Sequence, residues 1–144
     1  MTPPDSARPR VLVTGANGFV GAALLKRLQN KAFPVTGVAR GTERSGDLVP
    51  GPCLAGDADW TALLAGSQVV VHAAARVHVL KEKAADSLAA FREVNTAGTL
   101  RLARQAAEAG VRRFVFLSTI KVHGEQSPAG CPFGQDALLL PQDA

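Results

Sequence analysis

Apolar residues change their spacing along the chain in a regular alternation. Short apolar runs rich in Val and Leu predict strands at residues 10–14, 34–39, 53–55, 68–74 and 114–117. Between them, apolar residues at helical spacing predict helices at residues 18–30, around 60–64 and at 84–109. Strands that alternate with helices imply right-handed crossovers and a parallel sheet. The pattern therefore predicts an α/β fold, a doubly wound parallel sheet of about five strands in the order 3-2-1-4-5.

The spacing within the helix at 84–109 also predicts its buried face. Leu100, Ala103 and Ala107 fall at i, i+3 and i+7, which places them on one inward side. The polar residues between them are expected to point outward: Arg101, Arg104, Gln105 and Glu108. Gly110 follows directly and is well placed as the C′ residue that ends the helix.

Three glycines connect the first predicted strand to the first predicted helix. In the run from Thr14, Gly15 allows a tight turn, Gly18 lets a ligand approach the backbone, and Gly21 lets the helix pack closely on the strand. The start of that helix directs free N–H groups and the positive end of its dipole above the turn, which suits a pyrophosphate. Glycines alone would also fit an ordinary turn, but strand, turn and helix in this order predict dinucleotide binding.

Length and cysteine usage restrict the class of protein. A chain of 144 residues suits one domain with a sizeable core. No stretch approaches the ~18 consecutive apolar residues of a membrane span, and residues 1–10 lack the apolar core of a signal peptide. Cys53 and Cys131 lie far apart without metal-ligand spacing. We therefore expect a cytoplasmic protein with no metal and no membrane partner.

The net charge of +4 does not indicate a nucleic-acid partner. The basic residues are scattered along the chain and only 5% of residues are aromatic, so no continuous basic stripe with aromatic interleaving exists. The charge fits a solvated surface, a site for an acidic nucleotide ligand, or both.

Five short motifs give the chain a resemblance to a known family. They are Thr14 to Gly21 (TGANGFVG), Gly56-Asp57, Val71 to Ala75 (VHAAA), Asn95 to Thr99 (NTAGT) and Leu117 to Gly124 (LSTIKVHG). In this order and spacing they resemble the N-terminal portion of the extended short-chain dehydrogenase/reductase family, which includes NAD-dependent nucleotide-sugar epimerases, dehydratases and 4-reductases related to UDP-glucose 4-epimerase. The resemblance implies a Rossmann-like fold, NAD(P) as cofactor and a nucleotide sugar as substrate.

The resemblance implies a role for each matching residue. The expected cofactor-binding residues are Gly15, Asn17, Gly18, Phe19, Val20, Gly21, Asp57, Ala58, Ala73, Ala74 and Ala75, together with Arg40, for which the reason is given below. Backbone amides of Phe19 and Val20 would cover the pyrophosphate, and Asp57 with Ala58 would contact adenine. Asp57 or Asp59 is also placed to cap the short helix near residue 60, so both roles stay open for Asp57. Residues 73–75 would line the nicotinamide-side ribose, or serve strand–helix packing only.

A second group of residues concerns the reaction. Thr119 falls on the family's catalytic Ser/Thr, whose hydroxyl would hydrogen-bond the reacting sugar oxygen; a threonine at a strand end can also be a simple cap. Asn95 is expected to support the structure rather than touch a ligand. We assign no catalytic role to His72, which lies inside an apolar strand, or to His123, because neither has a carboxylate partner nearby in sequence.

The end of the second strand departs from the dinucleotide fingerprint. An acidic residue is expected there to hold the ribose 2′-hydroxyl, but the sequence reads Val38-Ala39-Arg40-Gly41. Ala39 leaves space, and Arg40, assisted by Arg44, would place a guanidinium beside a 2′-phosphate. The alternative is an exposed loop arginine. We therefore expect NADP in preference to NAD.

The chain also lacks the family's catalytic tyrosine. In the family a Tyr-x-x-x-Lys follows the Ser/Thr by roughly two dozen residues, and this sequence contains no tyrosine. We expect a tail at 1–9, an NAD(P)-binding domain at 10–123, and at 124–144 a loop leading toward the missing pair, the sugar-binding region being absent. The prediction is the cofactor-binding part of a nucleotide-sugar epimerase, reductase or dehydratase, inactive alone, which forms a homodimer or self-associates. The alternative is a non-catalytic NADP-binding regulator or redox sensor.

Overall fold

The computed structural model describes residues 8–41, 46–77 and 86–142 and contains one parallel sheet. Its strands are β1 (Val11–Thr14), β2 (Val35–Arg40), β3 (Leu48–Gly51), β4 (Val69–His72) and β5 (Arg113–Phe116). They lie in the order β3-β2-β1-β4-β5, and every neighbouring pair is parallel. The predicted fold class and strand order are confirmed.

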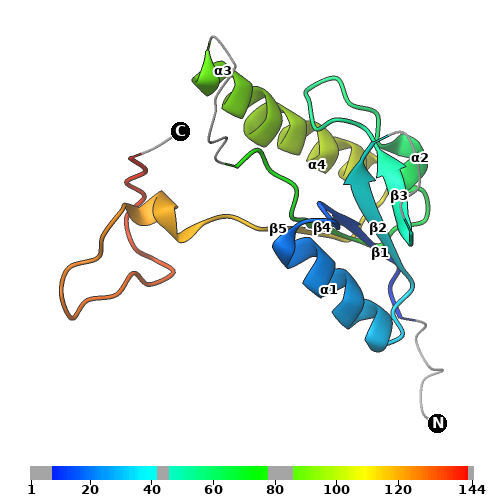
Figure 1. Cartoon of the computed structure of the whole chain (residues 1–144), viewed down its shortest axis with the longest axis horizontal. Helices are drawn as coiled ribbons and strands as arrows, with labels where there is room; N and C mark the ends of the chain where they lie inside the picture. The colour runs from blue at the N-terminus through cyan, green and yellow to red at the C-terminus, as the bar shows by residue number, and fades with distance from the viewer. Residues whose placement is uncertain (1–7, 42–45, 78–85, 143–144) are drawn as a thin grey trace.

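The helix α1 (Phe19–Asn30) covers one face of this sheet, and α2 (Thr61–Leu64) and α4 (Thr99–Glu108) cover the other (Figure 1). The other helical elements of the described residues are α3 (Ser87–Phe91), the π-helix η1 (Arg92–Gly98) and the 3₁₀-helix η2 (Ile120–His123). Because side chains alternate along a strand, β1 contributes to both layers. Val11 and Val13 pack with Leu25 of α1 on one face. Leu12 packs with Leu102 of α4 on the other, where Trp60 and Leu64 complete the core.

The third strand is not where the sequence pattern placed it. It spans Leu48–Gly51 rather than residues 53–55, and Val49 pairs with Val38 of β2. Pro50 is tolerated because β3 is an edge strand, where one side of the backbone needs no partner. Gly51 is required by packing, since an added Cβ would lie 2.3 Å from a methyl carbon of Val38.

The predicted buried face of the last long helix is also wrong. Leu100 is 49% exposed, whereas Leu102 and Ala106 are fully buried and Gln105 is nearly so. Leu102 and Ala106 join the core cluster around Trp60, and the Gln105 side chain accepts a hydrogen bond from the Trp60 N–H at 2.7 Å. A polar residue is therefore buried because it satisfies a backbone donor of another segment.

The end of α4 agrees with the expectation for Gly110. Its φ is +77°, its N–H donates to the Ala107 carbonyl, and the N–H of Val111 donates to the Ala106 carbonyl. These two bonds form a Schellman motif, which satisfies carbonyls left over at the helix end.

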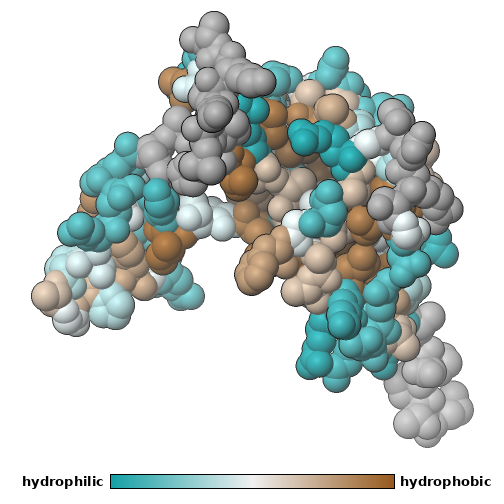
Figure 2. Space-filling model, in the orientation of Figure 1, coloured by the Kyte–Doolittle hydropathy of each residue, from teal (hydrophilic) through white to brown (hydrophobic). Residues whose placement is uncertain are grey.

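After β5 the chain leaves the α/β body and continues as an extended segment with η2 and irregular loops (Figure 1). Side chains at this edge of the sheet are open to solvent: Val115, Phe116 and Leu117 are 39%, 52% and 36% exposed. Figure 2 shows a hollow between the body and this segment, with apolar residues on the side of the body that faces it. In the described part of the chain, no helix has the length and apolar character needed to cross a bilayer.

Candidate functional site

The turn between β1 and α1 is shaped by close backbone contacts. Gly15 has φ +67°, and an added Cβ would lie 2.7 Å from the Ala74 amide nitrogen that follows β4. Gly21 is buried, and its Cβ would lie 2.1 Å from the Gly15 carbonyl oxygen. A side chain at either position would therefore displace backbone. Gly18 differs, because its Cβ would meet just the Gly15 oxygen, at 3.2 Å.

The N-terminus of α1 is open above this turn. Gly18 is the N-cap residue and adopts extended backbone angles without a side-chain cap. Phe19 and Val20 are 98% and 51% exposed, and Asn17 is exposed beside them. First-turn N–H groups have no acceptor within their own helix, and the helix dipole makes this end attractive to anions.

Arg40 and residues 73–75 lie at the carboxyl ends of two other strands of the same parallel sheet, on the edge where β1 also ends. Arg40 ends β2 and is exposed. Ala73 to Ala75 follow β4, and the Gly15 turn lies directly against Ala73 and Ala74. The sheet grows from β1 toward β2 on one side and toward β4 on the other. This topological switch point is where open α/β sheets bind ligands.

The predicted core role of His72 is confirmed. The ring is fully buried, with Nδ1 2.7 Å from the Thr14 Oγ1 and Nε2 2.9 Å from the Thr99 Oγ1. Burial lowers the pKa of His72 to about 4, so the ring is neutral and donates through one nitrogen while accepting through the other. Phe114 and Phe116 pack at ring-centroid distances of 6.0 and 5.8 Å. This network ties β1, β4 and α4 together beneath the glycine turn.

Asn95 supports the loop after β4, as expected. Its Oδ1 accepts from the Arg76 N–H at 2.8 Å, and its Nδ2 donates to the Arg76 carbonyl at 2.9 Å. One side chain thus bonds to both backbone polar groups of Arg76. Since Arg76 directly follows Ala75, this clamp holds the segment expected to line the cofactor.

Of the two aspartates expected to cap α2, Asp59 is the one that bonds to the start of the helix. The N-cap residue itself is Trp60, and Asp59 Oδ1 accepts from the Thr61 N–H at 2.9 Å and from the Thr61 hydroxyl at 2.6 Å. The bonds from Thr61 hold the pKa of Asp59 below its ordinary value. The Asp57 side chain is exposed, between the exposed Gly56 and the buried Ala58.

Thr119 and His123 lie on the segment after β5. Thr119 is the N-cap of η2, and its Oγ1 accepts from the Lys121 N–H at 3.3 Å, so the simple capping role is present. His123 Nδ1 donates to the Leu138 carbonyl at 3.1 Å and its ring packs against Phe133. The bond to Leu138 places the ring proton on Nδ1, but a carbonyl, unlike a carboxylate, carries no charge that would stabilise the protonated imidazole.

Sequence reasoning missed three side chains that hold the loop containing Asp57. Glu93, Arg101 and Gln105 hydrogen-bond to the backbone of Gly56, Ala58 and Trp60. Their spacing along the helix is the one signal that could have found them. Arg44 lies outside the described residues, as do residues 1–7 of the predicted tail and residues 84–85 of the predicted helix.

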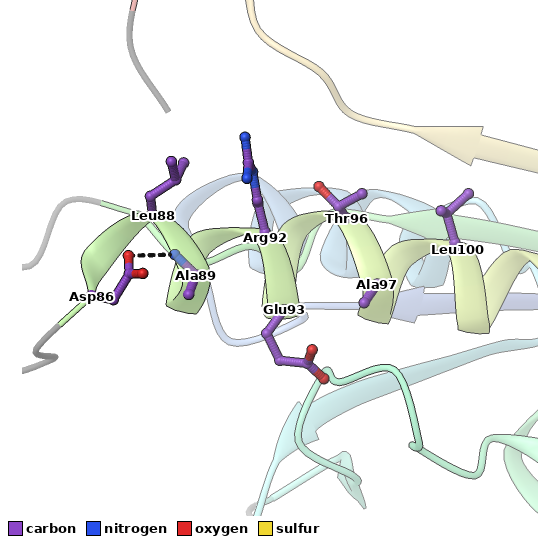
Figure 3. Close-up of a pocket in the computed structure, with 8 residues that line it drawn as sticks. All are labelled: Asp86, Leu88, Ala89, Arg92, Glu93, Thr96, Ala97 and Leu100. Carbon is purple, nitrogen blue, oxygen red and sulfur yellow. Dashed lines mark hydrogen bonds between the residues drawn. The ribbon is translucent and has the colours of Figure 1, made fainter.

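One open depression of about 530 Å³ lies elsewhere, along the helical segment α3–η1–α4. Figure 3 shows its lining: Asp86, Leu88, Ala89, Arg92, Glu93, Thr96, Ala97 and Leu100. No residue predicted to bind cofactor belongs to this lining. Across residues 8–41, 46–77 and 86–142, no cluster of His, Cys, Asp and Glu is suited to hold a metal ion.

The glycine turn, the open helix N-terminus and the switch point form the arrangement typical of dinucleotide-binding α/β folds. The model of the NAD dependent epimerase/dehydratase family matches residues 11–142, and this chain belongs to that family. It is 42% identical over 143 residues to a UDP-glucose 4-epimerase of Vibrio cholerae and 34% identical over 152 residues to one of Mycolicibacterium smegmatis. These alignments cover 96% and 92% of this chain but 44% and 45% of the relatives, so the chain spans less than half their length.

Solved structures give the same result. A short-chain dehydrogenase/reductase superfamily protein from Agrobacterium tumefaciens with bound NAD has a TM-score of 0.76 and 33% identity, over 93% of this chain and 40% of that one. MoeE5 in complex with UDP-glucuronic acid and NAD has a TM-score of 0.74 and 27% identity, over 92% and 43%. The family resemblance read from the motifs is confirmed.

Proposed function

We propose that this chain is the cofactor-binding part of an NAD(P)-dependent nucleotide-sugar epimerase, reductase or dehydratase. The observation that carries the proposal is the open N-terminus of α1 above the Gly15 turn, at the switch point of the sheet. UDP-glucose 4-epimerase relatives, and a neighbour whose structure contains both a UDP-sugar and NAD, support the substrate class.

Different residues of the chain bind different parts of the cofactor. The N–H groups of Phe19 and Val20 bind the pyrophosphate. The extended backbone angles of Gly18 would accept many residues, so the reason for a glycine there is the room that it leaves for the pyrophosphate. Asn17 borders the same turn. The small side chains of residues 73–75 leave space for the nicotinamide-side ribose, while Asp57 and Ala58 contact the adenine.

Arg40 favours a 2′-phosphate on the adenine ribose. Its exposed guanidinium stands at the end of β2 where an acidic residue would hold a 2′-hydroxyl. A planar guanidinium binds a phosphate through two parallel N–H···O bonds. The proposed preference is therefore NADP over NAD.

The bound nicotinamide supplies a hydride acceptor or donor for a sugar carbon. Thr119 is the residue of this chain that would hydrogen-bond the reacting sugar oxygen, and its hydroxyl is exposed. A threonine hydroxyl has a pKa far above neutrality, so it polarises the oxygen and does not act as a base. The base implied by family resemblance is a tyrosine, which is absent from these 144 residues.

The test is titration calorimetry of the wild-type chain and Gly18→Val with NAD⁺ and NADP⁺. A valine side chain would fill the space assigned to the pyrophosphate, so binding should be lost while circular dichroism stays unchanged. The matched control is Gly134→Val, since a Cβ there meets no atom within 4 Å. A folded Gly18→Val chain that binds cofactor like the control would refute the phosphate site, and a wild-type chain that binds neither dinucleotide would refute the proposal.

A further inference from the structure

Three side chains of one helical segment hold the backbone of residues 56–60. Glu93 Oε1 accepts from the Gly56 N–H at 2.8 Å. Arg101 Nε donates to the Ala58 carbonyl at 3.1 Å. Gln105 Oε1 accepts from the Trp60 N–H at 2.7 Å. We call this set of three hydrogen bonds the loop ladder.

The loop ladder has a regular register. Positions 93, 97, 101 and 105 are four residues apart on the helix, and the bonded loop positions 56, 58 and 60 are two apart. Position 97 is an alanine, and a Cβ added to Gly56 would lie 3.3 Å from the Cβ of this alanine. At Gly98 a Cβ would lie 2.7 Å from Leu54 and 2.8 Å from the Ala55 nitrogen. Small residues thus let the loop lie directly against the helix.

The π-helical turn explains how Glu93 reaches the same side as Gln105. Four residues of an α-helix make slightly more than one turn, so a row of i, i+4 positions drifts around the axis. The wider turns of η1, between Arg92 and Gly98, take more residues and offset this drift. Figure 3 shows the Glu93 carboxylate pointing toward the neighbouring loop, away from Leu88, Arg92 and Thr96.

We propose that the loop ladder positions Asp57 for the adenine of the cofactor, with Glu93 as the positioning residue next to it. This proposal rests on the proposed cofactor function. Asp57 is exposed, yet the Gly56 N–H before it and the Ala58 carbonyl after it are both held by the helix. A loop that is ordered before the ligand arrives loses less conformational entropy on binding. A carboxylate accepts hydrogen bonds, so the group it would recognise is the 6-amino group of adenine.

The two ends of the loop ladder have separable roles. The Gln105–Trp60 bond is buried in the core, where its loss would leave a backbone N–H unsatisfied and weaken the fold. The Glu93–Gly56 bond is exposed, so the freed N–H can bind water. Replacing Glu93 therefore loosens the loop beside Asp57 while the core stays intact.

The test compares wild type, Glu93→Ala and Glu93→Gln, with Glu108→Ala as a control at the exposed end of the same helix. Each chain is titrated with NAD⁺ and with nicotinamide hypoxanthine dinucleotide, in which a carbonyl replaces the 6-amino group. We expect wild type to favour NAD⁺ about tenfold, and Glu93→Ala to lose about tenfold in NAD⁺ affinity together with most of that discrimination. Glu93→Gln keeps an acceptor and should behave like wild type, as should Glu108→Ala.

The outcomes distinguish this inference from the proposed function. A wild-type chain that binds neither NAD⁺ nor NADP⁺ refutes both. If wild type binds but does not discriminate, or if Glu93→Ala discriminates as well as Glu108→Ala, the loop ladder proposal alone is wrong. Equal losses in Glu93→Ala and Glu93→Gln would also overturn it, because the acceptor oxygen would then not be what matters.

Discussion

Lowering the pH should destabilise this protein through His72. The ring is fully buried, and burial lowers its pKa from 6.5 to about 4. Between these two values the unfolded chain binds a proton at this residue and the folded chain does not. The free energy of unfolding is therefore unaffected above pH ~6.5, falls as the pH drops, and reaches its full loss near the folded-state pKa.

The size of the effect follows from the pKa difference. Each unit of pKa difference corresponds to ~1.4 kcal/mol, so the change from 6.5 to about 4 amounts to about 3 kcal/mol. A typical domain has a free energy of unfolding of about 5–15 kcal/mol, so this loss would be large. Protonation would also place a hydrogen on each ring nitrogen. The hydroxyls of Thr14 and Thr99 would then both have to accept a hydrogen bond from the ring.

Urea unfolding from pH 7.5 to 4.5 measures the effect. We expect wild type to lose most of the ~3 kcal/mol over this range. His72→Gln has an amide that can donate and accept but does not titrate, so it should be less stable at neutral pH and nearly insensitive to pH here. His123→Gln, on the segment after β5, should retain the wild-type slope. If wild type and His72→Gln lose stability in parallel, the burial argument for His72 is refuted.

Three further predictions concern binding, association and activity. Arg40→Ala should weaken NADP⁺ binding by roughly 1.5–3 kcal/mol in calorimetry and leave NAD⁺ unchanged; equal wild-type affinity for both cofactors would contradict this. The 144-residue chain should self-associate in light scattering, because the outer edge of β5 presents unpaired backbone next to exposed Val115; Val115→Lys should reduce association, and a wild-type monomer at high concentration would count against it. With cofactor and a panel of nucleotide sugars, the chain should show no hydride exchange, since loss of a general base costs ~10²–10⁴ in rate and Thr119 cannot replace it; turnover that disappears in His123→Ala would overturn this expectation.

Much of the fold could be predicted because its signals are local. Strand order followed from the alternation of apolar runs with helical segments, and the glycine turn followed from residue spacing. The positive φ of Gly15 and the tight approach of Gly21 to the Gly15 carbonyl are requirements of short-range backbone geometry. Such requirements restrict which residues can occupy a position, so they are visible in the sequence.

The errors in the sequence-based predictions arose where contacts with other segments decide which residues are buried or paired. The spacing of α4 allowed more than one inward face, since alanine is small enough for either side. Leu102 was buried because Trp60 and Leu64 form a core there, and Gln105 because the Trp60 N–H needed an acceptor. The third strand lies at Leu48–Gly51 because this segment pairs with β2 at an open edge of the sheet, where Pro50 is tolerated.

The sequence by itself determined the class of fold, the glycine turn after β1 and the family, because each depends on spacing within a short segment. Only the tertiary structure decided what holds the site in shape. Thr14 and His72 are 58 positions apart, and Gly56 and Glu93 are 37 apart. No local pattern links residues at such separations, because hydrogen bonds between them exist only after the sheet has formed and the helix has packed on it.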